Sequence, residues 1–460
     1  MSEKSSRERL ESRLGFILIS AGCAIGIGNV WKFPYITGQY GGGAFVLVYL
    51  FFLLVLGVPV LTMEFSMGRA SRKSPVRLYQ ALEPNKTSWH IHGYVAMAGN
   101  YILMMFYTTV AGWMLRYFVD MAIGKFEGAN PKQVGELFSQ MLASPLEMTV
   151  YMAVVVIASF AVCAIGLQNG LEKITKVMMI ALLVIMLVLA VNSVFLPGAK
   201  EGLKFYLIPD FAKMQKSGVF NVVVAAMNQA FFTLSLGIGA MAIFGSYIGN
   251  NQSLMGEAVN VAFLDTFVAF ASGLIIFPAC FAYNVQPDSG PSLIFITLPN
   301  IFNHMPLGRL WGSLFFVFMS FAAVSTVLAV FENIISCIRD LFHISRAKAC
   351  VINCILILLL SMPCVLGFNI WSNIQPLGAD SGILDFEDFI VSNILLPLGA
   401  LVYTIFCVSK YGWGFEKFKT EANKGDGIKV KDYMRFYMTY ILPFMILCIF
   451  LLGLYSFFNK

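Results

Sequence analysis

Long apolar runs separated by short polar stretches repeat along the whole chain. Each run is about 18 residues or longer, which is the length an α-helix needs to cross a bilayer. Charged residues gather between the runs. Eleven such segments lie near residues 14–38, 41–68, 93–122, 149–166, 173–195, 219–246, 257–283, 307–338, 348–367, 388–408 and 436–457. The pattern predicts an all-α polytopic membrane protein with eleven spans.

The composition supports the same conclusion. Of the 460 residues, 58% are apolar and 12% are charged, whereas about 25% are charged in an average soluble domain. One water-soluble core cannot hide so many apolar side chains, so the bilayer must solvate many of them. The first run begins near Leu14 and is too long and too rich in Gly and Trp for a cleaved signal peptide. We therefore expect it to be a retained span.

The cysteines and histidines give no sign of catalysis. The nine cysteines lie mostly inside apolar runs without CxxC or other metal-binding spacing, so we expect small buried hydrophobic side chains. The four histidines fall in loops or at span ends, and no nucleophile–base pair is visible. No soluble domain is evident between the spans. These features argue against an enzyme.

The basic residues predict the orientation in the membrane. The loop between the ninth and tenth spans, residues 367–388, has no Lys or Arg and four acids. The positive-inside rule then places the N-terminus in the cytoplasm, and an odd number of spans places Lys460 outside. The net charge of +6 suits an anionic membrane leaflet and not a nucleic acid. Three basic segments carry this prediction: Lys4, Arg7, Arg9 and Arg13; Arg69, Arg72, Lys73 and Arg77; Lys410, Lys417, Lys419, Lys424, Lys429, Lys431 and Arg435.

Two spans contain residues that interrupt helices. The first has Gly22, Gly26 and Gly28 within seven residues, and the sixth has Gly237 and Gly239 at its centre. A glycine costs about 1 kcal/mol in a helix interior, and freed backbone groups in a membrane need partners inside the protein. Close packing of small residues is one explanation. The five-helix separation favours unwound backbone instead, because two inverted five-helix repeats place paired breaks at a central site.

Four motifs lie in or near these breaks: GIGNVWKFPY, GGGAF at 41–45, PVLTMEFSMGR at 59–69 and FFTLSLGIG at 231–239. In order and spacing they resemble the neurotransmitter:sodium symporter family, in particular its bacterial, LeuT-like amino-acid transporters. The likeness runs through at least the first ten spans. The eleven-span tyrosine and hydrophobic amino-acid transporters look most similar, since most relatives have a twelfth span. The rule that paired helix breaks mark a central site was drawn partly from this family. The inference from the breaks and the inference from the motifs are therefore not independent.

The resemblance implies the LeuT fold. Its two inverted repeats would be residues 14–195 and 219–408, with spans one and six unwound at mid-membrane. Residues 1–13 and 409–435 would be cytoplasmic, and 436–457 the eleventh span. The implied function is sodium-coupled import of an amino acid by alternating access in a bacterial inner membrane. Two sodium ions and no organic cofactor are expected. The resemblance does not decide between a monomer and a homodimer. The alternatives are a proton-coupled carrier on this fold, an amino-acid-sensing receptor and a channel.

Oxygen ligands suit a hard cation such as sodium, and the resemblance implies two sets of them. The first sodium site (Na1) would use Ala24, Asn29, Thr233, Asp265 and the substrate carboxylate. The second (Na2) would use the carbonyls of Gly22, Ile25 and Ala322 and the hydroxyls of Ser325 and Thr326. Outside this family, serine and threonine hydroxyls within a helix more often bond to their own backbone.

Asp265 is the most informative departure from the family. It lies in the apolar stretch VAFLDTFVAF, and an intramembrane acid marks function by default. Many relatives have Asn here, with a nearby Glu or a bound chloride supplying negative charge. The position of that Glu is Ala269 in this chain. We hypothesise that Asp265 carries the charge itself, which would make transport chloride-independent and would permit proton exchange as sodium leaves.

The N-terminal ends of half-helices suit a carboxylate. By resemblance, the substrate carboxylate would meet the Gly28 N–H and the Tyr107 hydroxyl, and its amino group the carbonyls near Ala24, Phe232 and Ser235. At Gly26, monoamine-transporting relatives have an Asp, so here the ligand should bring its own carboxylate. An apolar pocket favours a hydrophobic or aromatic side chain without ranking tyrosine, tryptophan, phenylalanine and leucine. Its expected lining is Cys23, Leu103, Tyr107, Phe232, Ile238, Thr326 and Val330.

Two gates are also implied. Outside, Lys32 would pair with Asp388, or with its rival Asp385, above Tyr107 and Phe232. Relatives usually have Arg at this position, and Lys lacks the bidentate fork of Arg, so the gate should be looser. Inside, the expected set is Arg7, Asp340 and Tyr247.

Three further polar residues lie within the spans. By resemblance, Glu64 accepts backbone N–H bonds from the unwound sixth span, Glu332 belongs to a cytoplasmic polar network, and Gln229 braces the outer gate. Between spans, residues 123–148 look amphipathic, and residues 284–306 are expected to form a re-entrant or lid-like hairpin.

Overall fold

The computed structural model describes residues 8–283, 292–379 and 381–458. Within these ranges, nine helical segments are long and apolar enough to cross a membrane. They match nine of the eleven spans expected from the sequence. Their bounds are Gly43–Ser71, Ile91–Ala122, Pro145–Ile165, Leu167–Val194, Leu254–Ala282, Gly308–Phe342, Arg346–Leu366, Ile383–Val408 and Met434–Tyr455.

The two other expected spans, the first and the sixth, each consist of two shorter helical pieces. The first has α1 (Arg13–Ala24), then η1 (Gly28–Lys32) running into α2 (Phe33–Gln39), with a bend of 57° at the break. The sixth has α12 (Val219–Thr233) and α13 (Ala240–Tyr247). The predicted break of both spans is confirmed.

Backbone conformation explains why the sixth span breaks. Ser235, Gly237 and Gly239 have φ angles of 51°, 98° and 74°, in a region that glycine tolerates and other residues rarely adopt. At Gly237, an added Cβ would lie 2.2 Å from the Leu396 carbonyl oxygen. Glycine is therefore required at this position both by its φ angle and by the close approach of the tenth span.

Several spans contain a short π-helical turn, the ninth is interrupted at Ser361, and short helices connect the spans. The divided spans contain α3 (Gly43–Phe52), η2 (Leu53–Gly57) and α4 (Val58–Ser71); η3 (Leu167–Glu172) and α9 (Lys173–Val194); α17 (Arg346–Leu360) and α18 (Met362–Leu366); α19 (Ile383–Phe389), η5 (Ile390–Leu395) and α20 (Leu396–Val408); α22 (Met434–Phe436), η6 (Tyr437–Ile441) and α23 (Leu442–Phe458). The connecting helices are α5 (Pro75–Leu82), α7 (Pro131–Ala143), α10 (Ala199–Leu207), α11 (Phe211–Lys216), η4 (Leu293–Thr297) with α15 (Leu298–His304), and α21 (Phe415–Ala422).

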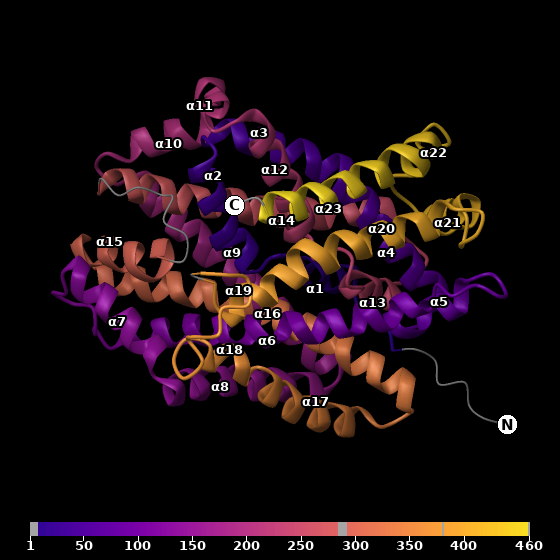
Figure 1. The fold of residues 1–460 in the computed structure, drawn as a ribbon, viewed down its shortest axis with the longest axis horizontal. Helices are drawn as coiled ribbons and strands as arrows, with labels where there is room; N and C mark the ends of the chain where they lie inside the picture. The colour runs from indigo at the N-terminus through magenta and orange to yellow at the C-terminus, as the bar shows by residue number, and fades with distance from the viewer. Residues whose placement is uncertain (1–7, 284–291, 380, 459–460) are drawn as a thin grey trace.

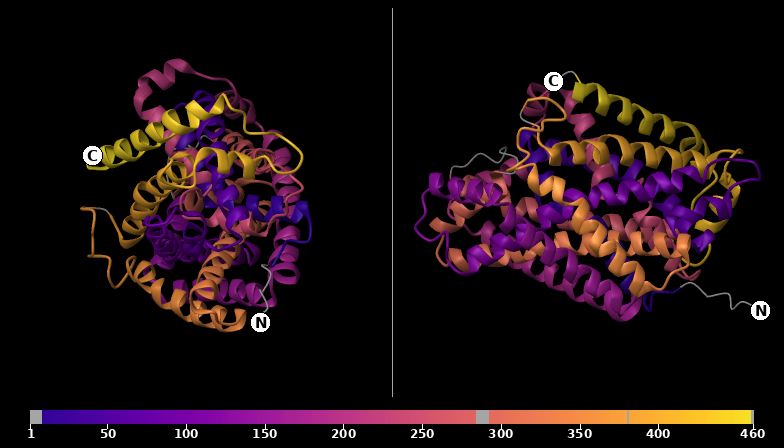
Figure 2. Two further views of the ribbon diagram at one scale, coloured as in Figure 1. Left: turned by 90° about the vertical axis from the view of Figure 1, so that its right-hand side faces the viewer. Right: turned by 60° about the horizontal axis from the view of Figure 1, so that its bottom comes forward.

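The broken spans lie inside the bundle and the last span lies on its outside. Helices α6 (Ile91–Ala122) and α16 (Gly308–Phe342) pack along each other, α8 (Pro145–Ile165) packs on both, and α14 (Leu254–Ala282) packs on α9 and α10. The C-terminal α23 runs along the surface (Figure 2), where Phe444 and Leu451 are exposed. Apolar side chains exposed in this way are suited to lipid.

Polar loops from distant parts of the chain meet at one end of the bundle, where α5 and α21 lie (Figure 1). Arg69 Nε lies 2.8 Å from Glu421 Oε1, and its Nη1 donates to the Gln252 carbonyl at 2.7 Å. These contacts join the loops after the second, sixth and tenth spans. They therefore lie on one side of the membrane, as the predicted orientation requires.

The opposite end carries α7, α10 and α15 (Figure 1). Helix α7 buries Val134 and Met141 while most of its other side chains are exposed, so the amphipathic pattern at 123–148 is confirmed. Residues 284–291 of the expected hairpin lie outside the described residues. The rest of that segment forms η4 and α15.

Candidate functional site

Five backbone and side-chain oxygens converge beside the break in the first span. The Thr326 hydroxyl on α16 has a single proton to donate, yet it faces four carbonyl oxygens, so at least three of them receive no proton from it. The Cys23 carbonyl also accepts the Ser235 hydroxyl at 3.3 Å, and the Ala322 carbonyl accepts the Ser325 hydroxyl, so the Gly22 and Ile25 carbonyls share the one proton of Thr326. Buried oxygens that converge with few donors favour a hard cation. The four carbonyls are those of Gly22 (3.3 Å), Cys23 (3.4 Å), Ile25 (3.3 Å) and Ala322 (3.4 Å).

The neighbouring Ser325 Oγ lies 3.0 Å from the Ala322 carbonyl oxygen. All five residues expected for the second sodium site are therefore together. Gly22 makes the approach possible, because an added Cβ would lie 3.3 Å from Ser325 Cβ and 3.2 Å from Met179 Sδ. Gly22 itself lies within α1, so close packing explains this glycine. Gly26 and Gly28 lie at the break.

A second polar cluster lies on the other side of the same break. Asp265 on α14 is fully buried. Asn29 Nδ2 donates to its Oδ1 at 2.7 Å, and the Thr233 hydroxyl donates to its Oδ2 at 2.8 Å. The Asn29 Oδ1 accepts the Gly26 N–H at 3.2 Å, which ties this cluster to the break. Three of the four protein residues expected at the first sodium site thus meet, and Ala24 lines the adjoining cavity.

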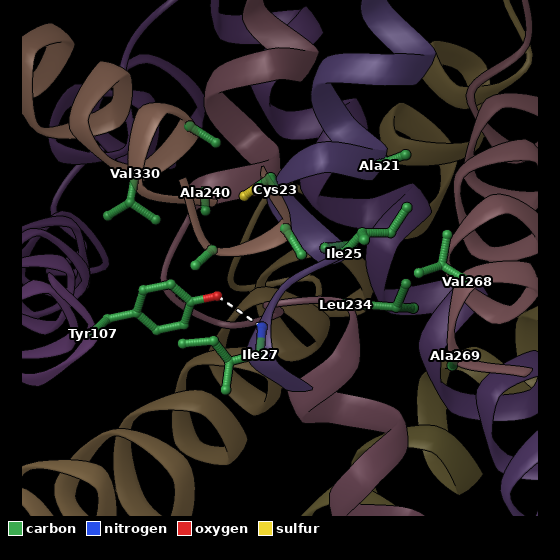
Figure 3. Packing of buried hydrophobic residues seen from close by; sticks show 14 of the residues in the cluster. Ala21, Cys23, Ile25, Ile27, Tyr107, Leu234, Ala240, Val268, Ala269 and Val330 are labelled. Atoms are coloured by element: carbon green, nitrogen blue, oxygen red, sulfur yellow. Dashed lines mark hydrogen bonds between the residues drawn. The ribbon is translucent and has the colours of Figure 1, made fainter. Parts of the chain in front are cut away.

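A small cavity of about 20 Å³ lies between the two broken spans and α6. Eight of the ten expected substrate residues line it, whereas the Cys23 carbonyl faces Thr326 and Val330 stands beside Tyr107 (Figure 3). Sequence reasoning left out Gly26 from the lining, and Val391 and Leu396 from the tenth span. Val391 could have been found, since it follows Asp388 by three residues on one helix face. The lining is Ala24, Gly26, Gly28, Leu103, Tyr107, Phe232, Ser235, Ile238, Thr326, Val391 and Leu396.

The unwound backbone of the first span forms one wall of this cavity. The Ile27 N–H donates to the Tyr107 hydroxyl at 3.0 Å (Figure 3). A Cβ on Gly26 would lie 2.3 Å from that hydroxyl, and a Cβ on Gly28 would lie 2.8 Å from the Phe232 ring. A side chain at either position would require Tyr107 or Phe232 to move. Since 20 Å³ holds about one water, a bound amino acid requires the surrounding side chains to move apart.

Side chains of other spans hold the unwound segments in place. Glu64 Oε1 accepts the Gly237 N–H at 2.6 Å, as the family resemblance implied. Gln229 Nε2 donates to the Gly28 carbonyl at 3.2 Å. The two broken spans therefore have polar partners for backbone groups that a continuous helix would have paired.

The outer gate differs from its expected form. Lys32 Nζ lies 3.8 Å from the centroid of the Phe232 ring, a favourable cation–π contact. Asp388 Oδ1 accepts the Ser392 hydroxyl, and Asp385 Oδ2 accepts the N–H of Gly382. Among residues 8–283, 292–379 and 381–458, no ion pair joins Lys32 to either acid. In this conformation Phe232, not a carboxylate, is the partner of Lys32.

The inner gate is described only in part. Arg7 lies outside the described residues. Its expected partner Asp340 accepts the Ser74 N–H at 2.8 Å, which joins α16 to the start of α5. The Arg7–Asp340 pair therefore stays a prediction.

Glu332 belongs to a polar network at the same end of the molecule. The Tyr247 hydroxyl donates to its Oε1 at 2.8 Å, and Arg346 pairs with both of its carboxylate oxygens. Arg346 also lies 3.5 Å from Glu8. The network around Glu332 was expected, but its basic partner Arg346 was missed, although the short connection between α16 and α17 keeps the two residues only 14 positions apart.

Comparisons with known proteins now identify the family. The model of the sodium:neurotransmitter symporter family matches residues 7–126 and 132–460. The chain belongs to this family. It is 34% identical to an uncharacterized sodium-dependent transporter of Bacillus subtilis, over 97% of this chain and 98% of the relative. It is 32% identical to one of Haemophilus influenzae, over 99% and 100%.

A solved structure has the same fold. The crystal structure of MhsT in complex with L-phenylalanine superposes with a TM-score of 0.86 at 36% identity, covering 97% of this chain and 99% of that one. The protein is thus a multi-pass transporter of the LeuT fold, with sodium as its coupling ion, and not an enzyme. In the described parts of the chain, no three His, Cys, Asp or Glu side chains gather as a transition-metal site would require.

Proposed function

We propose that this symporter imports a hydrophobic or aromatic amino acid together with sodium, by alternating access and without chloride. The observation that carries the proposal is the set of four carbonyl oxygens around Thr326, which outnumber the three hydroxyl groups that face them and would suit a desolvated sodium ion. Two sodium ions are proposed, because the cluster of Asn29, Thr233 and Asp265 offers a second set of oxygens.

The walls of the cavity support an amino acid as the substrate. Leu103, Ile238, Val391 and Leu396 are aliphatic, and Gly26 puts no carboxylate near an incoming amine. The solved relative MhsT holds L-phenylalanine. A substrate that brings its own carboxylate next to Asn29 would complete the first sodium site, which would couple the two fluxes directly.

Asp265 supports independence from chloride. It is a fully buried acid at the first sodium site, with Ala269 one helical turn further along α14. Its own carboxylate would balance the charge of sodium where other family members use a second acid or chloride. Each positive charge that moves inward through 100 mV then supplies about 2.3 kcal/mol for transport.

The decisive experiment is uptake into proteoliposomes, with each of the twenty amino acids as competitor and with sodium replaced by choline as the control. We expect concentrative uptake only with a sodium gradient, with large apolar amino acids competing best. Uptake driven equally by a proton gradient in choline would favour a proton-coupled carrier. Sodium-dependent binding without accumulation would favour a receptor, and uncoupled flux a channel.

A further inference from the structure

The Ile238 carbonyl, in the unwound part of the sixth span, has a hydrogen-bond partner on another helix. Asn100 Nδ2 on α6 donates to it at 2.8 Å and also donates to the Ala96 carbonyl, one turn back on α6, at 2.7 Å. Both hydrogens of this amide are thus used. The bond ties α6 to a backbone group that the break in the sixth span leaves without a helical partner.

The orientation of the Asn100 amide is set by a second asparagine. Asn333 Nδ2 on α16 donates to Asn100 Oδ1 at 3.1 Å. Both side chains are buried, with exposed fractions of 1% and 0%. Because Oδ1 accepts this bond, the amide nitrogen must face Ile238. Two long helices that pack on each other therefore fix the position of one carbonyl in the sixth span.

The same face of α6 continues into the substrate cavity. Leu103 and Tyr107 follow Asn100 by three and seven residues, so all three share a helix face. Leu103, Tyr107 and Ile238 line the cavity. Next to Asn100, a Cβ on Gly99 would lie 3.3 Å from Ile238 Cγ2. Asn100 therefore sets how close Ile238 comes to the α6 wall.

We propose that Asn100, oriented by Asn333, is a positioning residue that holds Ile238 and thereby sets the shape of the cavity for the amino-acid side chain. The proposal rests on the proposed function, because it concerns the same cavity. Without Asn100, the Ile238 carbonyl would be buried and unpaired, and the unwound segment would shift to find another donor. The cavity wall would move with it.

The test compares Asn100→Ala with Asn353→Ala. Asn353 is a matched control: it is a fully buried asparagine that bonds to Tyr101 of α6 and to the Ala349 carbonyl of its own helix, without reaching the sixth span. Initial rates of L-phenylalanine uptake are measured in proteoliposomes at saturating sodium. For Asn100→Ala we expect KM to rise at least about tenfold, with the maximal rate per folded transporter within about threefold. For Asn353→Ala, KM should stay within about twofold.

Hydrogen exchange of the protein without amino acid gives a second measurement that does not depend on transport. Amides of residues 234–240 should exchange faster in Asn100→Ala and, to a smaller extent, in Asn333→Ala, but not in Asn353→Ala. An unchanged KM and unchanged exchange in Asn100→Ala would overturn the proposal, as would equal effects in Asn353→Ala. If the wild-type protein takes up no L-phenylalanine, the choice of substrate fails while the exchange measurement still decides the role of Asn100.

Discussion

Thr326, near the break in the first span, differs from other buried threonines in the number of carbonyl oxygens that surround its hydroxyl. Most buried threonine hydroxyls in this protein donate to a carbonyl one turn back, as Thr404 does to Ala400 at 2.7 Å. Thr326 also faces its own turn, through Ala322, but three carbonyls of α1 and its break crowd the same hydroxyl. Both residues are threonines in apolar helices, and their surroundings distinguish the proposed sodium ligand from an ordinary helix hydroxyl.

Thr326→Val should therefore weaken sodium binding, because it removes one ligand oxygen while keeping the shape of the side chain. We expect the sodium concentration for half-maximal uptake to rise at least about tenfold, equivalent to about 1.4 kcal/mol. Thr404→Val is the control and should change the sodium concentration for half-maximal uptake by less than twofold. Equal sodium dependence in the two variants would refute the assignment of the second sodium site.

Asp265→Asn should make transport depend on an external anion. The substitution keeps an oxygen beside Asn29 but removes the negative charge of Asp265 from the proposed first site. We expect the wild-type protein to transport equally in chloride and in gluconate. The variant should lose most of its activity in gluconate and regain part of it in chloride. If the variant transported equally well in both salts, charge compensation by Asp265 would be wrong.

At the scale of elements, α1 is held at the end that enters the membrane as well as at its break. Glu172 on η3 is 2% exposed and accepts the N–H groups of Glu11 and Ser12 at 2.9 and 3.2 Å, and the Ser12 hydroxyl at 3.0 Å. Ser12 in turn caps α1 by accepting the Gly15 N–H. An anion at a helix N-terminus is favourable. This contact docks the half-helix whose carbonyls face Thr326 against the fifth span.

Glu172→Ala should loosen α1 without affecting the rest of the fold. Losing a charged, buried acceptor of backbone N–H groups costs about 1–3 kcal/mol locally, so amide exchange over residues 11–20 should accelerate at least about tenfold. Glu416→Ala removes an exposed partner of Arg435 and is the control, since exposed ion pairs contribute about 0–1 kcal/mol. Unchanged exchange in Glu172→Ala would show that packing alone holds α1.

At the scale of the whole molecule, the loops sort into two ends. Arg69, Glu421 and Gln252 join three loops at the end that carries α5 and α21, and Asn303 bonds to the Ala129 carbonyl at the other. The basic loops gather at the first of these ends, which the positive-inside rule predicts to be the cytoplasmic one. The two ends of the bundle in Figure 1 thus correspond to the two sides of the membrane.

Cysteines introduced at the two ends should react from opposite sides. Lys417→Cys lies in α21 and Lys132→Cys in α7, and both native side chains are exposed. The nine native cysteines are buried or partly buried, which keeps background labelling low. In right-side-out vesicles, a membrane-impermeant maleimide should label Lys132→Cys at once and Lys417→Cys only after permeabilisation. The reverse pattern would show that the orientation is inverted.

Much of this architecture follows from local rules. Apolar length gives the spans, and Gly26, Gly28, Gly237 and Gly239 mark the breaks, because the energetic cost of glycine in a helix and of unpaired backbone in lipid depends on the residues themselves. Family motifs then pointed to the oxygens around Thr326 and to the acid at Asp265. These predictions did not need the positions of other helices.

Only the tertiary structure decided which distant groups share a partner. It paired Lys32 with the Phe232 ring instead of Asp388, Glu332 with Arg346, and the Ile238 carbonyl with Asn100. It also separated Gly22, which packs inside α1, from the glycines at the break. Each outcome depends on how different helices pack against one another, and the spacing of residues along one helix carries no information about that packing.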